Sequence, residues 1–137
     1  MRHLTTRLAI AALRRGRSIE QFLGAHHVDG KAGVRWIEIQ PASDGYRIEL
    51  HEVLDLDEVA DVYEFPPLVE HDEAYFGQCI GLTEAETEAM ALAAPYGADD
   101  NRWVNQGMTG DEYHDFVKAR WATQKPRTGP NEPDLSA

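Results

Sequence analysis

Polar and hydrophobic side chains alternate most regularly between residues 46 and 53. One face of this segment contains Tyr46, Ile48 and Leu50, and the other contains Arg47, Glu49 and His51. This period of two predicts a half-buried strand, and residues 34–40 before it are also rich in β-forming side chains. Asp44 and Gly45 favour a tight two-residue turn between the two segments. The pattern predicts a β-hairpin whose apolar face meets the core and whose polar face carries ordinary solvated charge.

Residues 4–15 place apolar side chains at helical spacing, and Gly16 follows as the expected helix end. Ser18 and Gln21 then form a capping-box pattern, which predicts a short second helix over Ile19–Leu23. Two helices joined at a glycine are also the outline of a helix-turn-helix. The second element is too short for that function and begins without base-reading side chains, so DNA binding is not favoured.

The middle of the chain contains two further candidate strands. Asp61–Phe65 is rich in β-branched and aromatic residues and stops at two prolines, which favours a third strand with Tyr63 and Phe65 inward. A helical interpretation remains open, because Leu56, Val59, Ala60 and Tyr63 also fall on one helical face. Residues 76–82 form a possible fourth strand, which two glycines weaken.

Two capping-box patterns predict helices in the last third of the chain. Thr83 with Glu86 opens one, and Thr109 with Glu112 opens the other. The expected fold class is therefore α+β, with an antiparallel sheet of three to four strands, two N-terminal helices and two C-terminal helices. We expect a single domain over residues 1–122 and a disordered tail over 123–137, where proline is frequent.

Charge is unevenly distributed along the 137 residues, whose formal net charge is −11. Residues 1–35 hold seven Lys/Arg and two Asp/Glu, whereas residues 36–116 hold twenty Asp/Glu and two Lys/Arg. An acidic body repels phosphate backbones and attracts basic partners, so direct nucleic-acid binding by the body is not expected. Acidity that serves only solubility would give the same composition.

No catalytic or cofactor motif stands out in the sequence. We expect no cofactor, and the spacing of histidines and acids predicts no metal site. Cys79 lies in a predicted strand without an activating neighbour and is expected to be a buried structural residue. As an alternative function, His51 and His71 with nearby carboxylates would serve a small enzyme or a metal-binding protein.

The most suggestive feature is an acidic stretch interleaved with aromatic residues. Its candidate partner-binding residues are Asp55, Asp57, Glu58, Asp61, Glu64, Glu70, Asp72, Glu73 and Tyr75. Carboxylates steer a basic partner and aromatic side chains anchor it, so the pattern favours a non-enzymatic binding protein. A structural or self-associating subunit is a further alternative. If the aromatic residues belong to the core, the acids are merely solvated.

Several strings of the chain resemble a group of small acidic uncharacterised proteins of high-GC Gram-positive bacteria. They are RSIEQFLG, VRWIEI, LHEVLDL, DVYEFPPL and RWVNQG. That group has no assigned activity, so the resemblance implies no catalytic residue. In size, acidity and expected α+β build the chain is also similar to toxin-immunity proteins, which implies an inhibitor of a basic toxin such as a nuclease.

Two observations bear on the compartment. No apolar run approaches the length of a membrane-spanning helix, so no membrane association is expected. Cys79 is the only cysteine and can form no disulfide within the chain. A cytoplasmic location is therefore expected.

Overall fold

The computed structural model describes residues 2–68 and 77–124, which form a five-stranded antiparallel sheet with three α-helices. The α+β class is confirmed. The strands are β1 (Ile19–Val28), β2 (Lys31–Ala42), β3 (Gly45–Leu54), β4 (Gln78–Thr83) and β5 (Val104–Asn105), in the spatial order β4-β3-β2-β1-β5. The helices are α1 (Thr6–Arg14), α2 (Glu86–Ala93) and α3 (Thr109–Gln124), with 3-10 turns η1 (Val62–Glu64) and η3 (Ala94–Tyr96). The sheet therefore has five strands where three to four were expected, and the described residues form three α-helices where four were expected.

The predicted hairpin is present as β2 and β3, but its turn lies one residue earlier than expected. Ala42 pairs with Gly45, so Ser43 and Asp44 form the turn. Gly45 is the first residue of β3 because it pairs with Ala42. The end of β4 lies against it, since a Cβ at this position would be 2.1 Å from the Thr83 carbonyl oxygen. The corrected register places Trp36 opposite His51 and Glu38 opposite Glu49.

The segment expected to be a short helix, Ile19–Leu23, is instead the start of β1. Pairing with β2 overrides the local capping-box signal, and a register shift at Gly24 (φ 91°) bends the strand. His26 and His27 lie in the second half of β1. The helix-turn-helix alternative is therefore wrong.

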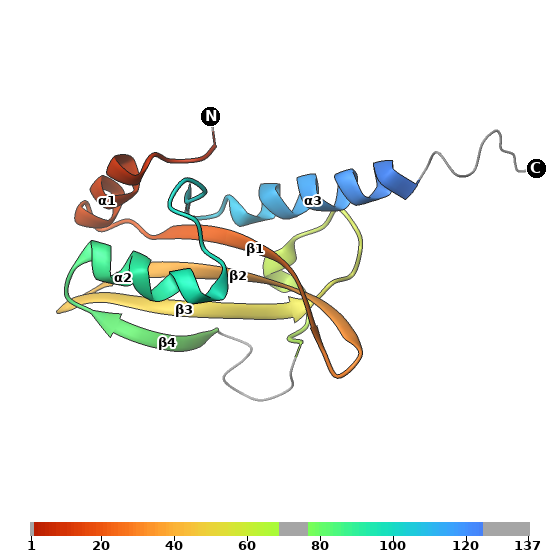
Figure 1. Ribbon diagram of the computed structural model, residues 1–137, viewed down its shortest axis with the longest axis horizontal. Helices are drawn as coiled ribbons and strands as arrows, with labels where there is room; N and C mark the ends of the chain where they lie inside the picture. Colours follow the sequence, from red (N-terminus) through yellow and green to blue (C-terminus); the bar gives the residue numbers. More distant parts are fainter. Residues whose placement is uncertain (1, 69–76, 125–137) are drawn as a thin grey trace, which may run out of the picture.

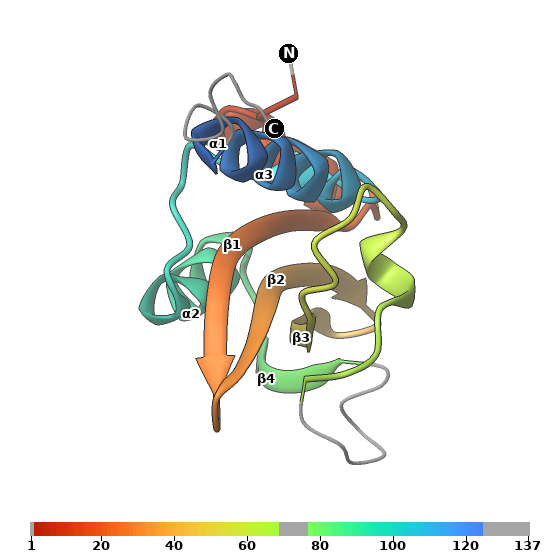
Figure 2. The same ribbon diagram turned by 90° about the vertical axis from the view of Figure 1, so that its right-hand side faces the viewer.

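The two faces of the sheet carry different cores. Helices α1 and α2 cover a face built around Ile19, Ile37 and Ile48, and Trp103 is fully buried there. Helix α3 and the η1 segment cover part of the opposite face, where Phe22 and Trp36 belong to the second core. Figure 1 shows α2 in front of the sheet and α3 along β1, and Figure 2 shows α2 and η1 on opposite sides of it.

The expected third strand is also corrected. Residues Val62–Glu64 form η1, because Asp61 Oδ1 accepts a hydrogen bond from the Tyr63 amide (3.1 Å) and starts a helical turn. Phe65 is buried as expected, whereas Tyr63 stays 39% exposed. Sheet contact resumes only at Pro67, which forms an isolated bridge to Val53.

Both predicted C-terminal helices are present, but α2 begins three residues after its predicted cap, whereas α3 begins at its predicted cap. Helix α2 begins at Glu86, with the Glu88 carboxylate accepting from the Ala85 amide (3.2 Å), while Thr83 ends β4. Helix α3 begins at Thr109 itself, whose side chain is buried, and runs to Gln124. Residues from 125 onward, which include most of the expected tail, lie outside the described residues.

The basic N-terminal segment folds onto the acidic body. The Arg2 guanidinium lies 2.5 Å from Glu112 and 2.8 Å from Asp115 on α3, and His3 lies 2.9 Å from Glu112. Burial by itself would raise the pKa of Glu112, but His3 and Arg2 outweigh it and hold that pKa below its usual range. Part of the positive charge of the head therefore neutralises the body.

Candidate functional site

The acidic edge, residues 55–64, leaves the end of β3 and runs along α3, from Arg120 beside Asp55 to Thr109 beside Tyr63. Its first carboxylate is internal: the Asp55 side chain is only 6% exposed, accepts from the Tyr113 hydroxyl (2.7 Å) and pairs with Arg120 (2.7 Å). Burial opposes the charged form of Asp55, but Arg120 and Tyr113 outweigh it and hold the pKa of Asp55 below its usual range. Asp55 therefore fixes the acidic edge to α3.

Asp57 continues this anchorage at the surface. Its carboxylate accepts from Arg120 (2.6 Å) and from the Trp121 indole N–H (3.0 Å), although the side chain is 57% exposed. The residue adopts a positive φ of 56°, which turns the chain back over the sheet. Asp57 is thus both a tether and an exposed charge.

The remaining carboxylates of the acidic edge face solvent, whereas Val62 is buried in the second core. Glu58, Asp61 and Glu64 are exposed, and three apolar side chains stand between them: Leu56, Val59 and Tyr63 are 41%, 45% and 39% exposed. The other candidate residues, Glu70, Asp72, Glu73 and Tyr75, lie outside the described residues, as does His71.

A recess of about 320 Å³ separates the acidic edge from the sheet. Its lining residues are Trp36, His51, Val53, Tyr63, Glu64, Phe65 and Pro67. The Trp36 and Tyr63 rings meet edge to face (5.4 Å), and the Trp36 and His51 rings stack in parallel (4.8 Å). The sheet thus supplies His51 and the acidic edge supplies Glu64 to one aromatic-lined hollow.

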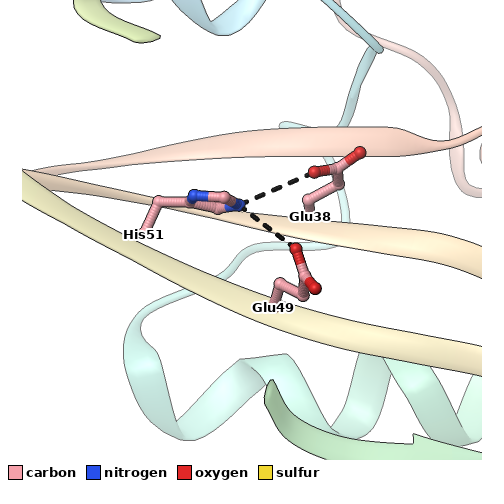
Figure 3. Close-up of side chains that lie close together, drawn as sticks. All are labelled: Glu38, Glu49 and His51. Carbon is pink, nitrogen blue, oxygen red and sulfur yellow. Dashed lines mark ion pairs between the residues drawn. The ribbon is translucent and has the colours of Figure 1, made fainter. Parts of the chain in front are cut away.

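Beside the recess, three polar side chains converge on the sheet face and form a carboxylate–imidazole cluster. Nε2 of His51 lies 3.6 Å from Glu38 Oε1 and 3.6 Å from Glu49 Oε1. Figure 3 shows the imidazole on β3 pointing between the two carboxylates. Both glutamates are buried, with 8% and 9% of their surface exposed, so the expectation of a solvated polar face is wrong here.

A third glutamate extends the row of acids across the sheet. Glu20 on β1 pairs with Glu38 and is 3% exposed. It accepts from the Tyr63 hydroxyl (2.6 Å), which ties the acidic edge to β1. Burial and the Glu20 carboxylate raise the pKa of Tyr63 well above its usual value, so Tyr63 stays neutral and donating.

The charge state of the cluster follows from its neighbours. Burial alone would raise the pKa of Glu38, but the imidazole of His51 and the amide of Gln40 outweigh it and hold that pKa below its usual range. Arg47 pairs with Glu49 Oε2 (2.6 Å). Glu38 is therefore ionised at neutral pH.

The sequence indicated His51 as a candidate functional residue, but it did not predict that Glu38 and Glu49 lie beside it. The available signal was the hairpin itself, since cross-strand pairing about a tight turn places alternate residues of both strands on one face. Cys79 lies on β4 opposite Glu49 and is exposed, not buried as expected, because β4 is the sheet edge.

No protein-family model, no curated protein and no solved structure matches this chain. In the part of the chain that the structure describes, no helix combines the length and apolarity needed to cross a membrane.

Proposed function

We propose that this chain is a non-enzymatic acidic binding protein, most concretely an immunity-type inhibitor of a basic toxin such as a nuclease. One observation carries the proposal: Leu56, Val59 and Tyr63 are exposed within nine residues that also contain four carboxylates. Partly exposed apolar side chains ringed by charge match the anatomy of a protein-binding surface.

Charge supports a basic partner for this surface. No Lys or Arg lies between residues 48 and 101, so the acidic edge keeps a net negative field although Arg120 pairs with Asp55 and Asp57. Such a field accelerates the encounter with a basic surface, most strongly at low ionic strength. An active site that binds nucleic-acid phosphates is one such basic surface.

The acidic edge is also held in shape before binding. Arg120 and Trp121 hold its first turn, and the Tyr63 hydroxyl binds Glu20. The segment returns to the sheet where the Leu54 amide donates to the Pro66 carbonyl (2.8 Å). A fixed surface loses less conformational entropy on association, which favours tight binding.

The remaining expectations belong to the same proposal. An inhibitor that protects its own producer acts where the toxin is made, and a lone unpaired cysteine suits a reducing cytoplasm. The likeness to small acidic bacterial proteins and to immunity proteins supports this assignment. A self-associating subunit is the alternative, and light scattering of the purified chain distinguishes it.

Association kinetics with a basic toxin encoded beside this gene test the proposal. We expect the triple variant Glu58→Lys, Asp61→Lys, Glu64→Lys to slow association by about tenfold or more at low salt. The double variant Leu56→Ser, Val59→Ser should mainly accelerate dissociation, because it removes anchors and not charge.

The matched control is the triple variant Asp44→Lys, Glu84→Lys, Asp100→Lys. It changes the net charge equally at exposed positions. Asp44 precedes β3, which carries the chain about 30 Å to the acidic edge. If both triple variants bind as the natural chain does, the acidic edge is not the binding surface.

A further inference from the structure

We propose that Glu38, Glu49 and His51 form a binding site for a first-row divalent metal ion, with Zn²⁺ as the best match. The proposal does not depend on the protein-binding function. It rests on three donor atoms on adjacent strands, the imidazole Nε2 and one oxygen of each carboxylate, all within 4.8 Å of one another.

The distances suit a shared cation better than direct hydrogen bonds. Nε2 of His51 lies 3.6 Å from each carboxylate oxygen, and a good hydrogen bond between these atoms would be about 2.7–3.2 Å. Two donors that each lie about 2.1 Å from a tetrahedral Zn²⁺ are separated by about 3.4 Å. The buried Nε2 atom has no hydrogen-bond partner.

Both carboxylates are oriented by hydrogen bonds from neighbouring side chains. Glu38 Oε2 accepts from the Gln106 amide (3.4 Å), and Glu49 Oε2 accepts from Arg47 (2.6 Å). Glu49 Oε1 also accepts from the Gln40 amide (3.2 Å), and its second lone pair is left for a cation. The two Oε1 atoms face His51. Supporting hydrogen bonds of this kind fix ligands around protein metal sites.

The imidazole is held equally firmly. Its ring stacks on Trp36 with an interplanar angle of 3°. Gly77 approaches the ring so closely that a Cβ there would lie 2.5 Å from Cε1. With a φ of 90° at Gly77, both the backbone conformation and the available space favour glycine.

Buried negative charge on this face of the sheet favours the binding of a cation. Glu20, Glu38 and Glu49 are cross-strand neighbours and all buried, and the described ion pairs provide them with one Lys/Arg partner, Arg47. Like charges opposite one another destabilise a sheet, and buried charges need compensation. A divalent cation between Glu38 and Glu49 supplies it.

The donor set also indicates which metal binds. An imidazole nitrogen with two carboxylate oxygens suits Zn²⁺ and its first-row neighbours, whereas Ca²⁺ takes six to eight oxygens. Three protein ligands leave a fourth position for water or for a ligand atom from the adjoining recess.

Titration of the metal-free chain with ZnCl₂ in a calorimeter, and with CoCl₂ by visible absorption, tests the site. We expect one equivalent to bind, with a Co²⁺ spectrum of low coordination number and a change in Trp36 fluorescence. Glu38→Gln, Glu49→Gln and His51→Gln should each weaken Zn²⁺ binding by about tenfold or more. CaCl₂ should bind far more weakly.

Glu52→Gln is the matched control: Glu52 faces His26 at 3.4 Å on the same sheet, but among the described residues this pair is not part of a group of three possible metal ligands. It should leave Zn²⁺ affinity within about twofold. Thermal unfolding in EDTA provides the second readout. With repulsion relieved, Glu38→Gln should not lower the melting temperature of the metal-free chain, but it should abolish the rise that Zn²⁺ produces.

Two results would overturn the proposal. One is an absence of Zn²⁺ and Co²⁺ binding by the natural chain, or binding that survives all three substitutions. The other is a fall in the melting temperature of the metal-free chain for both Glu38→Gln and Glu49→Gln, with no Zn²⁺ response in the natural chain. In that case the cluster is only a pair of polar contacts between His51 and the two carboxylates.

Discussion

Replacing Arg120 by Ala should destabilise the fold, because this guanidinium is the basic partner of the buried Asp55 carboxylate. Asp55 Oδ2 lies 2.7 Å from Arg120 Nη1, and the two side chains are 6% and 29% exposed. The Arg120 guanidinium also lies 5.0 Å from the Phe116 ring centroid, so the substitution removes packing as well as charge.

The expected magnitude lies between the values for buried and for exposed pairs. Breaking a buried pair costs about 3–5 kcal/mol, and losing an exposed pair costs about 1 kcal/mol or less. The Asp55 carboxylate keeps its hydrogen bonds from the Tyr113 hydroxyl and the Asp57 amide. We therefore expect a loss of about 2 kcal/mol in the free energy of unfolding, or roughly 6 °C in melting temperature for a domain of this size.

Urea unfolding followed by far-ultraviolet circular dichroism measures this loss, and pH identifies its origin. The folded state lowers the pKa of Asp55, so the charged carboxylate contributes stability above the unfolded-state value of about 3.9. That contribution declines as the pH falls below this value and is lost below the folded-state pKa. The difference between the natural chain and Arg120→Ala should shrink over the same range.

Arg14→Ala is the matched control for this prediction. Arg14 pairs with Glu86 at 3.3 Å, but its side chain is 69% exposed, so its removal should cost less than about 0.5 kcal/mol. Equal effects of the two substitutions, or a loss at Arg120 that does not change with pH, would refute the assignment of Asp55 as a buried anchor.

Two further predictions address the sheet edge. Gly45→Ala should destabilise the fold by about 2 kcal/mol or more and loosen β4, because the added Cβ would lie 2.1 Å from the Thr83 carbonyl oxygen. Urea unfolding measures the loss of stability, and amide hydrogen exchange measures the loosening of β4. A neutral effect would contradict the close packing of β4 against Gly45. Cys79, exposed on β4, should react with one equivalent of a thiol reagent in the native protein, whereas a reaction that requires denaturant would show that the thiol is covered.

The local sequence pattern was sufficient to predict an element where its own periodicity shows which face is buried. The alternation over residues 46–53, the helical spacing near the N-terminus and the clustering of acids were all visible in the sequence. They gave the hairpin, α1 and the α+β class, because burial of one face follows directly from periodicity.

Only the tertiary structure decided the elements whose conformation depends on a partner strand. Ile19–Leu23 has a helix-start signal but becomes β1, because β2 and β5 offer it hydrogen bonds on both sides. Val104–Asn105 becomes a strand for the same reason, although two residues carry no periodicity. Such pairings join residues far apart in the sequence, which no local pattern records.

The same division holds for the candidate sites. The sequence alone determined that residues 55–64 are acidic and interleaved with apolar side chains. The fold decided that Asp55 is an internal anchor, and that Glu58, Asp61 and Glu64 are the exposed charges. It also set the distances among Glu38, Glu49 and His51, because their convergence depends on the register of β2 against β3, and a shift of the turn by one residue changes every cross-strand pair.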